Sequence, residues 1–223
     1  MNRHFVCFIF VLSWVLGVQA QTRHYDFAMT RLGDEWRYVR QADSSKYVVC
    51  DSVLRLYGNV AELRDSGSAT FIGLPQTSEH VEAETLLTTF DDENGDEAGL
   101  AVYWSDSCYV QAYLNNIRGE HRVKLRFQLK SHQWVMAEQH LEHRRIEKLW
   151  FRVTCDGDFY RFYYSEDGKK YHLLDSVEKM LLSPAIAQGN GELLVGMYAY
   201  TGSVKLQMGY SYADFRYFDF KTW

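Results

Sequence analysis

The sequence predicts an all-β fold, an antiparallel sandwich of two sheets, and three observations support this prediction. Many segments alternate apolar and polar residues with a period of two between closely spaced turn signals, which is typical of a sandwich or a barrel. Aromatic residues are abundant, with 16 Tyr, 13 Phe and 6 Trp, and such rings favour pleated, half-buried surfaces. Helical periodicity is weak. The 223 residues, 47% of them hydrophobic, suffice for one substantial domain of this class.

The N-terminal segment is predicted to be a secretory signal peptide. It has a basic residue at Arg3, an apolar run over 5–18 and small residues before a cleavage point after Ala20. A membrane anchor is the alternative, but the apolar run is shorter than the roughly 20 residues that span a bilayer. We therefore expect a signal peptide over residues 1–20, export to the periplasm, the cell surface or the medium, and a single mature domain over residues 21–223.

The stretch EAGLAVYWSDSCYVQAYL, residues 97–114, is expected to form two paired strands. Its second strand begins at Cys108 and Tyr109. Alternation separates the residues of the first strand onto two faces, and the sequence leaves open which face meets solvent. One face would hold Leu100, Val102 and Trp104, and the other Ala101 and Tyr103.

Residues 149–174 show the strand pattern most clearly. Strands are predicted over 149–154, 159–165 and 171–174, separated by turns that each contain Asp-Gly. This pair of residues tolerates the positive φ of tight hairpins. In the middle strand one face is expected to be buried and the other partly wet, as in antiparallel sheets that cover a core on one side. The buried face would hold Tyr160, Phe162 and Tyr164, and the wet face Arg161 and Tyr163.

Two segments leave room for helical structure. Residues 129–149 have helical composition, which would allow a short helix around 137–145. The alternative, which we favour, is a strand followed by a charged loop. The sequence SVEKMLLSP, which ends at Pro184, predicts one helical turn. Neither segment changes the expectation of a fold built from sheets.

The net charge and the cysteine content restrict the classes of partner and the disulfide chemistry that the sequence allows. A net charge of −5 provides no basic stripe for phosphate groups, so no nucleic-acid partner is expected. Once Cys7 leaves with the signal peptide, Cys50, Cys108 and Cys155 remain. One disulfide and a free thiol would be compatible with an oxidising compartment, but three buried, inert thiols are favoured, because free Cys packs as a small hydrophobe.

The sequence contains candidate catalytic and metal-binding groups. His80, Glu82 and Glu84 share one face of a predicted strand, as a two-carboxylate hydrolase would require. They do not reproduce the Glu-x-Asp-x-x-Glu strand of sandwich glucanases, so an outward polar face is favoured. The acidic segment 90–97 lacks the spacing of an EF-hand loop. The histidines also form no zinc motif. We therefore expect no metal or other cofactor; a structural calcium ion is compatible with the sequence, but no motif supports one.

Several stretches, taken in order, resemble one known family. Near the start of the mature chain, a Trp-x-x-x-Arg strand with Trp36 and Arg40 is paired with a Leu-Arg-Leu strand over 54–56. An Ala-Gly-Leu strand over 98–100 lies in the middle of the chain. They are followed by a Tyr-x-Phe-x-Tyr-Ser-x-Asp-Gly hairpin over 160–168. The sequences Leu182-Ser183, Val-Gly-Met-Tyr-Ala over 195–199 and Asp214-Phe215 complete the series. Over about residues 34–218 the chain resembles the concanavalin A-like C-terminal domain of glycoside hydrolase family 43 β-xylosidases.

This resemblance implies a two-sheet jelly-roll sandwich that normally follows a five-bladed propeller and packs against it. In that family the propeller holds the catalytic carboxylates, and no room for a propeller is left in this chain. No catalytic residue is therefore carried over, and we expect a domain without enzymatic activity of its own.

The leading hypothesis is a carbohydrate-binding or accessory domain for xylan- or arabinan-type polysaccharides. Two alternatives remain: a detached subunit that docks on a separately encoded propeller glycosidase, and a sandwich hydrolase that uses Glu82 or Glu84. The expected partners are thus a polysaccharide or oligosaccharide, or else a separate glycoside hydrolase. The sugar rings would stack on exposed aromatic side chains, for which the candidates are Trp104, Tyr109 and Trp134.

Overall fold

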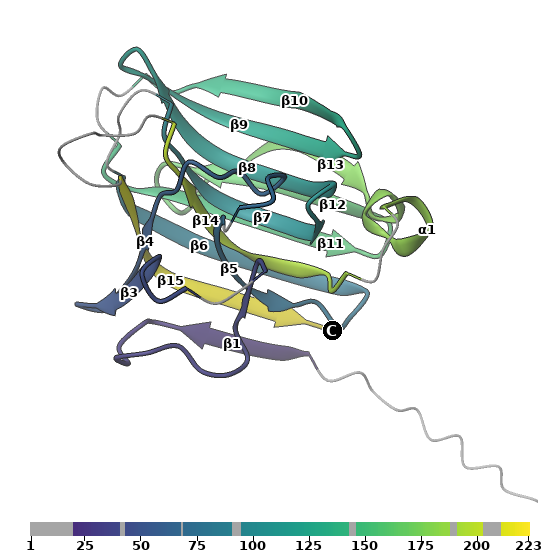
Figure 1. Ribbon diagram of the computed structural model, residues 1–223, viewed down its shortest axis with the longest axis horizontal. Helices are drawn as coiled ribbons and strands as arrows, with labels where there is room; N and C mark the ends of the chain where they lie inside the picture. Colours follow the sequence, from purple (N-terminus) through teal and green to yellow (C-terminus); the bar gives the residue numbers. More distant parts are fainter. Residues whose placement is uncertain are drawn as a thin grey trace, which may run out of the picture.

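The computed structural model confirms an antiparallel β-sandwich (Figure 1). It describes residues 20–40, 43–67, 69–90, 95–142, 146–187, 191–202 and 211–223. Within these ranges the larger sheet has the order β13 (His172–Glu178), β12 (Phe159–Ser165), β11 (Leu149–Asp156), β6 (His80–Phe90), β15 (Tyr212–Thr222), β4 (Val53–Tyr57) and β3 (Tyr47–Cys50), with β1 (Gln21–Tyr25) also paired to β15. The smaller sheet has the order β10 (His132–His140), β9 (Glu120–Leu129), β8 (Cys108–Ile117), β7 (Glu97–Ser105), β14 (Leu194–Tyr200), β5 (Thr70–Pro75) and β2 (Arg37–Tyr38).

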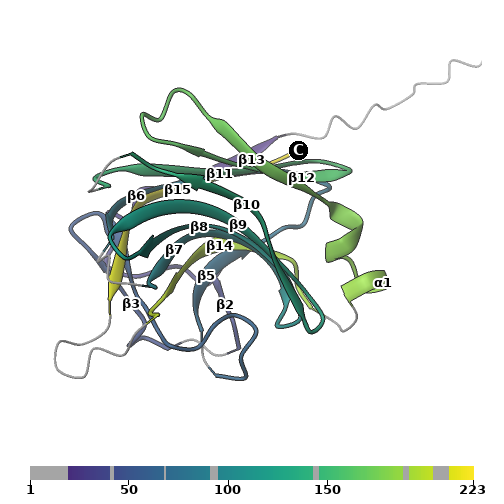
Figure 2. The same cartoon turned by 90° about the horizontal axis from the view of Figure 1, so that it is seen from above.

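The two sheets form two layers, and the smaller sheet arches beneath the larger one (Figure 2). The main core lies between the layers, and Leu100, Val102 and Trp104 of β7 belong to it. Ala101 and Tyr103 belong to a second apolar cluster on the other, concave face of the arch. The predicted division of this strand into two faces is therefore confirmed, and both faces are buried.

The predicted strands around residue 160 are also confirmed, and β12 has the predicted bounds. Its Tyr160, Phe162 and Tyr164 are buried, and the hairpin turns on either side place Gly157 and Gly168 at positive φ. In the segment with helical composition, β10 continues to residue 140, and residues 141, 142 and 146–148 belong to no helix or strand, so the strand-and-loop alternative is correct for the described residues. The predicted helical turn is present as a 3₁₀ helix, η1 (Lys179–Leu182), followed by the short α1 (Pro184–Ala187).

The three cysteines of the described chain carry free thiols. Cys108 and Cys155 are buried as expected, whereas Cys50, on the edge strand β3, is only half-buried. The prediction of three buried thiols is thus wrong for Cys50, because an edge strand has no neighbour on one side to cover it.

We expect Cys50 to be alkylated by iodoacetamide in the native protein well before Cys108 and Cys155. Burial raises the pKa of Cys108 to about 11 and also raises the pKa of Cys155, and the thiolate is the reactive form. Peptide mapping after timed alkylation measures the order, and full labelling in denaturant is the control. Rapid labelling of Cys108 or Cys155 in the native protein would contradict the burial of these two thiols.

The predicted signal peptide, with Cys7, lies almost wholly outside the described residues, which begin at Ala20. In the described part of the chain, no helix is both long enough and apolar enough to cross a bilayer.

Candidate functional site

The three aromatic residues proposed for sugar stacking differ sharply in exposure. Trp134 is 47% exposed, Trp104 is 9% exposed and Tyr109 is fully buried. Tyr109 lies on the concave face, where its ring stacks beside that of Tyr103 at 6.2 Å and joins a cluster that includes Leu63. The expectation of exposure is therefore corrected for Tyr109 and largely for Trp104, since other segments cover both rings.

Trp104 and Trp134 lie on the same face and toward the same end of the smaller sheet. Trp104 belongs to the core between the sheets, and Trp134 is paired in register with Phe127 of that core. Two strands, β8 and β9, separate them, which corresponds to about 15 Å at the usual strand spacing. The turns at this end are joined by the backbone N–H of Lys130, which donates to the carbonyl of Ser107 at 2.6 Å.

The ring of Trp134 is held in place by two aromatic neighbours. His132 stacks on it with centroids 5.6 Å apart and planes inclined by 12°, and Phe127 lies at 5.9 Å. Such contacts restrict the ring while almost half of its surface remains exposed. Trp134 is thus a fixed, flat apolar platform.

Two cavities flank Trp104, of about 450 and 420 Å³. The strand register shifts between Tyr103 and Ser105, which marks a β-bulge at Trp104. Bulges redirect side chains near functional sites. We call the larger cavity the β7 cavity; it is lined by residues 37–40, 103–107, 191, 192 and 194. The smaller one lies between Trp104 and the segment that carries η1 and Pro184.

Two ion pairs line the β7 cavity. The guanidinium of Arg37 lies 3.3 Å from the carboxylate of Glu192, and that of Arg40 lies 2.9 Å from Asp106. The hydroxyl of Tyr103 donates to Asp106 at 2.5 Å. Burial, together with this carboxylate, raises the pKa of Tyr103, so the hydroxyl keeps its proton and remains a donor.

Arg40 is the fixed point of this arrangement. Its backbone has a φ of 65°, in the left-handed region that non-glycine residues rarely adopt. Its guanidinium also donates to the carbonyl oxygens of Leu63, Asp65 and Gly67. The segment between β4 and β5 is thereby tied to one wall of the β7 cavity.

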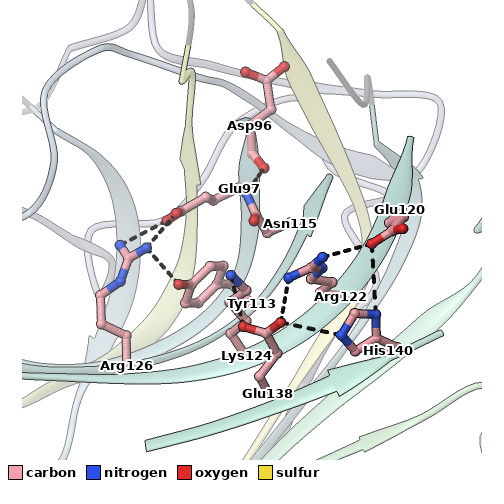
Figure 3. Close-up of polar contacts among 10 residues, drawn as sticks. All are labelled: Asp96, Glu97, Tyr113, Asn115, Glu120, Arg122, Lys124, Arg126, Glu138 and His140. Atoms are coloured by element: carbon pink, nitrogen blue, oxygen red, sulfur yellow. Dashed lines mark hydrogen bonds and ion pairs between the residues drawn. The ribbon is translucent and has the colours of Figure 1, made fainter. Parts of the chain in front are cut away.

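The concave face carries a separate polar network, shown in Figure 3. At its centre the guanidinium of Arg126 donates to both carboxylate oxygens of Glu97, at 2.5 and 3.0 Å, and to the hydroxyl of Tyr113. Toward the sheet edge, Glu138 accepts from Arg122 and Lys124. Because the central pair is almost buried and its charges are matched within the network, we assign the network a structural role in the sheet.

The candidate catalytic carboxylates lie on the outer face of the larger sheet. His80, Glu82 and Glu84 of β6 alternate with buried residues, so the predicted shared face is confirmed. One oxygen of Glu84 accepts from Arg152 and Tyr171, each at 2.7 Å, and the other accepts from the hydroxyl of Tyr217 at 2.5 Å. Glu84 thus organises a cation and two phenols on this face.

Within the described residues, no group of three or more His, Cys, Asp or Glu side chains could hold a metal ion. Residues 91–94 of the acidic segment lie outside the described chain, as does His143. Three other histidines have contacts of a different kind: His132 stacks on Trp134, His172 stacks on Tyr164, and His140 lies beside Glu138 and Glu120.

Comparison with known proteins identifies the family of the chain. The family model of the beta-xylosidase C-terminal concanavalin A-like domain matches residues 24–221. The chain belongs to this family. A putative beta-xylosidase of Escherichia coli K12 is 29% identical over 178 residues, which are 75% of this chain and 32% of that protein. The chain therefore spans about a third of the length of that relative.

Solved structures show the same fold. The GH43 protein BlXynB from Bacillus licheniformis superposes with a TM-score of 0.79 at 23% identity, over 90% of this chain and 39% of that one. The Bacteroides ovatus protein described as Xyloglucan PUL GH43B superposes with a TM-score of 0.78 at 22% identity, over the same shares of both chains. A functionally unknown protein from Saccharomyces cerevisiae has a TM-score of 0.56 at 17% identity, and the match covers 81% of this chain and 91% of that one.

The sequence pointed to part of the β7 cavity only. Trp104 was singled out as an aromatic residue, and Arg40 appeared in the Trp-x-x-x-Arg resemblance. Asp106 and Glu192 were missed as site residues, because each acquires its arginine partner from a distant part of the chain. No local pattern signals such a pair.

Proposed function

We propose that this beta-xylosidase C-terminal domain is an exported accessory domain that binds xylan- or arabinan-type polysaccharide and does not cleave it. The observation that carries the proposal is the clustering at one end of the sandwich of an exposed, fixed tryptophan, Trp134, and a polar cavity beside a second, Trp104. Export follows from the predicted signal peptide. The beta-xylosidase names among the relatives supply the class of polysaccharide.

The chemistry of this end suits a sugar. Pyranose and furanose rings expose C–H groups on their faces, which pack on flat aromatic rings, while their hydroxyl groups require donors and acceptors. Trp134 provides the flat ring, and the ion pairs of the β7 cavity provide both kinds of polar group. Since both parts are held by packing and hydrogen bonds, little ordering is needed on binding.

The contacts of Glu84 favour binding over hydrolysis. A two-carboxylate mechanism needs one acid to protonate the leaving group and a second to attack or to activate water. Both oxygens of Glu84 already accept hydrogen bonds from Arg152, Tyr171 and Tyr217. The carboxylate is therefore engaged as an acceptor, which favours a structural role for Glu84 over one as the proton donor of a hydrolase.

Replacement of Trp134 by alanine tests the binding proposal. We expect the wild-type domain to be retarded in affinity gels that contain xylan or arabinan, and Trp134→Ala to bind about fivefold more weakly, because stacking contributes on the order of 1 kcal/mol. The matched control is Leu173→Ala, which removes a side chain of 55% exposure from the other sheet. Equal retardation of wild type and Trp134→Ala would contradict the placement of the platform.

Docking onto a separately encoded propeller glycosidase is a second candidate function. The observation that favours it is the exposed apolar surface of edge strand β10, where Val135 is 52% and Met136 is 37% exposed. Exposed apolar groups on an edge strand are suited to protein contact. Absence of retardation in every gel, together with co-elution of the domain with such a glycosidase, would favour docking over glycan binding.

A further inference from the structure

The β7 cavity differs from the Trp134 platform in being lined by charged side chains. Its charged lining residues are two arginines, Arg37 and Arg40, and two acids, Asp106 and Glu192. We propose that this cavity is a subsite for an uncharged sugar residue and discriminates against uronic acids. The inference rests on the proposed function and deepens it by naming the class of sugar that the site selects.

The balance of charges carries the argument. The positive and negative side chains are equal in number and are already paired within the cavity, Arg37 with Glu192 and Arg40 with Asp106. A carboxylate brought in by a uronic acid would meet two carboxylates as well as the two guanidiniums paired with them, so it would gain no net charge attraction and would be repelled at close range by Asp106 and Glu192. A neutral sugar encounters no such repulsion.

Hydroxyl groups match the polar atoms that remain accessible. A hydroxyl both donates and accepts, so one sugar can donate to a carboxylate and accept from a guanidinium. The side chains of Asp106 and Glu192 are about half exposed, at 48% and 53%, and that of Arg37 is 44% exposed. Hydrogen bonds to charged partners of this kind are stronger than those between neutral groups.

The arrangement is also held before any ligand arrives. Arg40 is fixed by three backbone carbonyls, and Arg37 donates to the carbonyl of Asp34 at 2.9 Å. The left-handed backbone at Arg40 and the bulge at Trp104 are irregularities of the kind that accompany binding sites. Groups fixed in this way lose little conformational freedom on binding.

Size and apolar lining are consistent with a short saccharide. The volume of about 450 Å³ falls in the range of small-molecule sites. Trp104, Val39 and Leu194 contribute apolar surface to the wall, against which the C–H face of a sugar can pack. The cavity is therefore lined both by apolar residues and by two ion pairs.

The test compares one neutral xylo-oligosaccharide with the same oligosaccharide carrying a glucuronic acid substituent, by isothermal titration calorimetry on the complete mature domain. We expect the wild type to bind the neutral ligand about fivefold more tightly. In Glu192→Gln the cavity gains a net positive charge and Arg37 is released, so we expect this preference to vanish or to reverse. Glu192 is half exposed, so the substitution leaves the core intact.

The matched control is Glu120→Gln, which removes another exposed carboxylate paired with an arginine, Arg122, far from the cavity on the β8–β9 turn. It is expected to keep the wild-type preference. If both ligands bind equally to the wild type, or the preference is unchanged in Glu192→Gln, the neutral subsite is overturned while glycan binding stands. If neither ligand nor any polysaccharide binds, the proposed function is overturned together with the subsite.

Discussion

Replacement of Arg126 by methionine is expected to lower the free energy of unfolding by about 3–5 kcal/mol, the cost of leaving one member of a buried ion pair unpaired. The side chains of Arg126 and Glu97 are only 12% and 8% exposed. The substitution removes the cation and both hydrogen bonds to the carboxylate, along with the bond to Tyr113. Urea unfolding followed by tryptophan fluorescence measures the change.

The pH dependence of this loss in stability, and its size in a double variant, test whether the unpaired carboxylate of Glu97 causes it. Burial already raises the pKa of Glu97 although Arg126 opposes it, and removal of Arg126 raises that pKa further. When the pKa of Glu97 is higher in the folded state than in the unfolded state, the folded state binds more protons at pH values between the two. The free energy of unfolding therefore falls as the pH rises from the unfolded-state pKa to the folded-state pKa. Arg126→Met should therefore be less destabilised near pH 5 than at pH 8.

The double variant Glu97→Gln/Arg126→Met should recover part of the loss and lose this pH dependence, because no buried charge remains. A double variant as unstable as Arg126→Met at pH 8, with the same dependence on pH, would show that the buried carboxylate is not the cause.

Replacement of Gly196 by valine is expected to cost at least about 3 kcal/mol, at the upper end of the cost of overpacking. Gly196 lies in β14 between β5 and β7, and its register partner on β5 is Gly73. A Cβ atom at Gly196 would lie 2.2 Å from the carbonyl oxygen of Ile72 and 2.3 Å from the Cα of Gly73. Both are backbone atoms of a central strand, so relief requires the sheet itself to separate.

Thermal unfolding by circular dichroism measures this effect, and a loss of about 3 kcal/mol corresponds to roughly 6–12 °C for a domain of this size. The matched control is Gly119→Ala on the β8–β9 turn, where φ is +83° but no atom lies within 4 Å of the added Cβ. That variant should lose only about 1–2 kcal/mol, the cost of a left-handed backbone for a residue with a Cβ. Equal losses in the two variants would refute the steric explanation.

Strand faces could be predicted because they depend on a local rule. Successive side chains of a strand point to opposite faces, so Leu100 and Val102 had to lie together and apart from Ala101, whatever the rest of the chain did. The same rule placed Tyr160 and Phe162 in the core. The Asp-Gly pairs likewise marked the turns at Gly157 and Gly168, because the required positive φ is a property of the residue itself.

Exposure could not be predicted in the same way. Tyr109 and Trp134 are both aromatic residues near the starts of their strands, β8 and β10, yet one is fully buried and the other is 47% exposed. The difference arises because β8 lies in the middle of its sheet, with the β4–β5 segment packed over its concave face through Leu63, while β10 lies at the edge. Such coverage depends on segments distant in sequence.

The sequence by itself determined the antiparallel sandwich, the faces of its strands and its resemblance to the beta-xylosidase C-terminal domain, since these follow from local periodicity, turn chemistry and ordered motifs. The tertiary structure alone decided the candidate site. The pairs of Arg40 with Asp106 and of Arg37 with Glu192 form only where β2, the β7–β8 turn and the segment before β14 meet. Ion pairs between distant segments depend on how the chain packs, and packing leaves no periodic signal in the sequence.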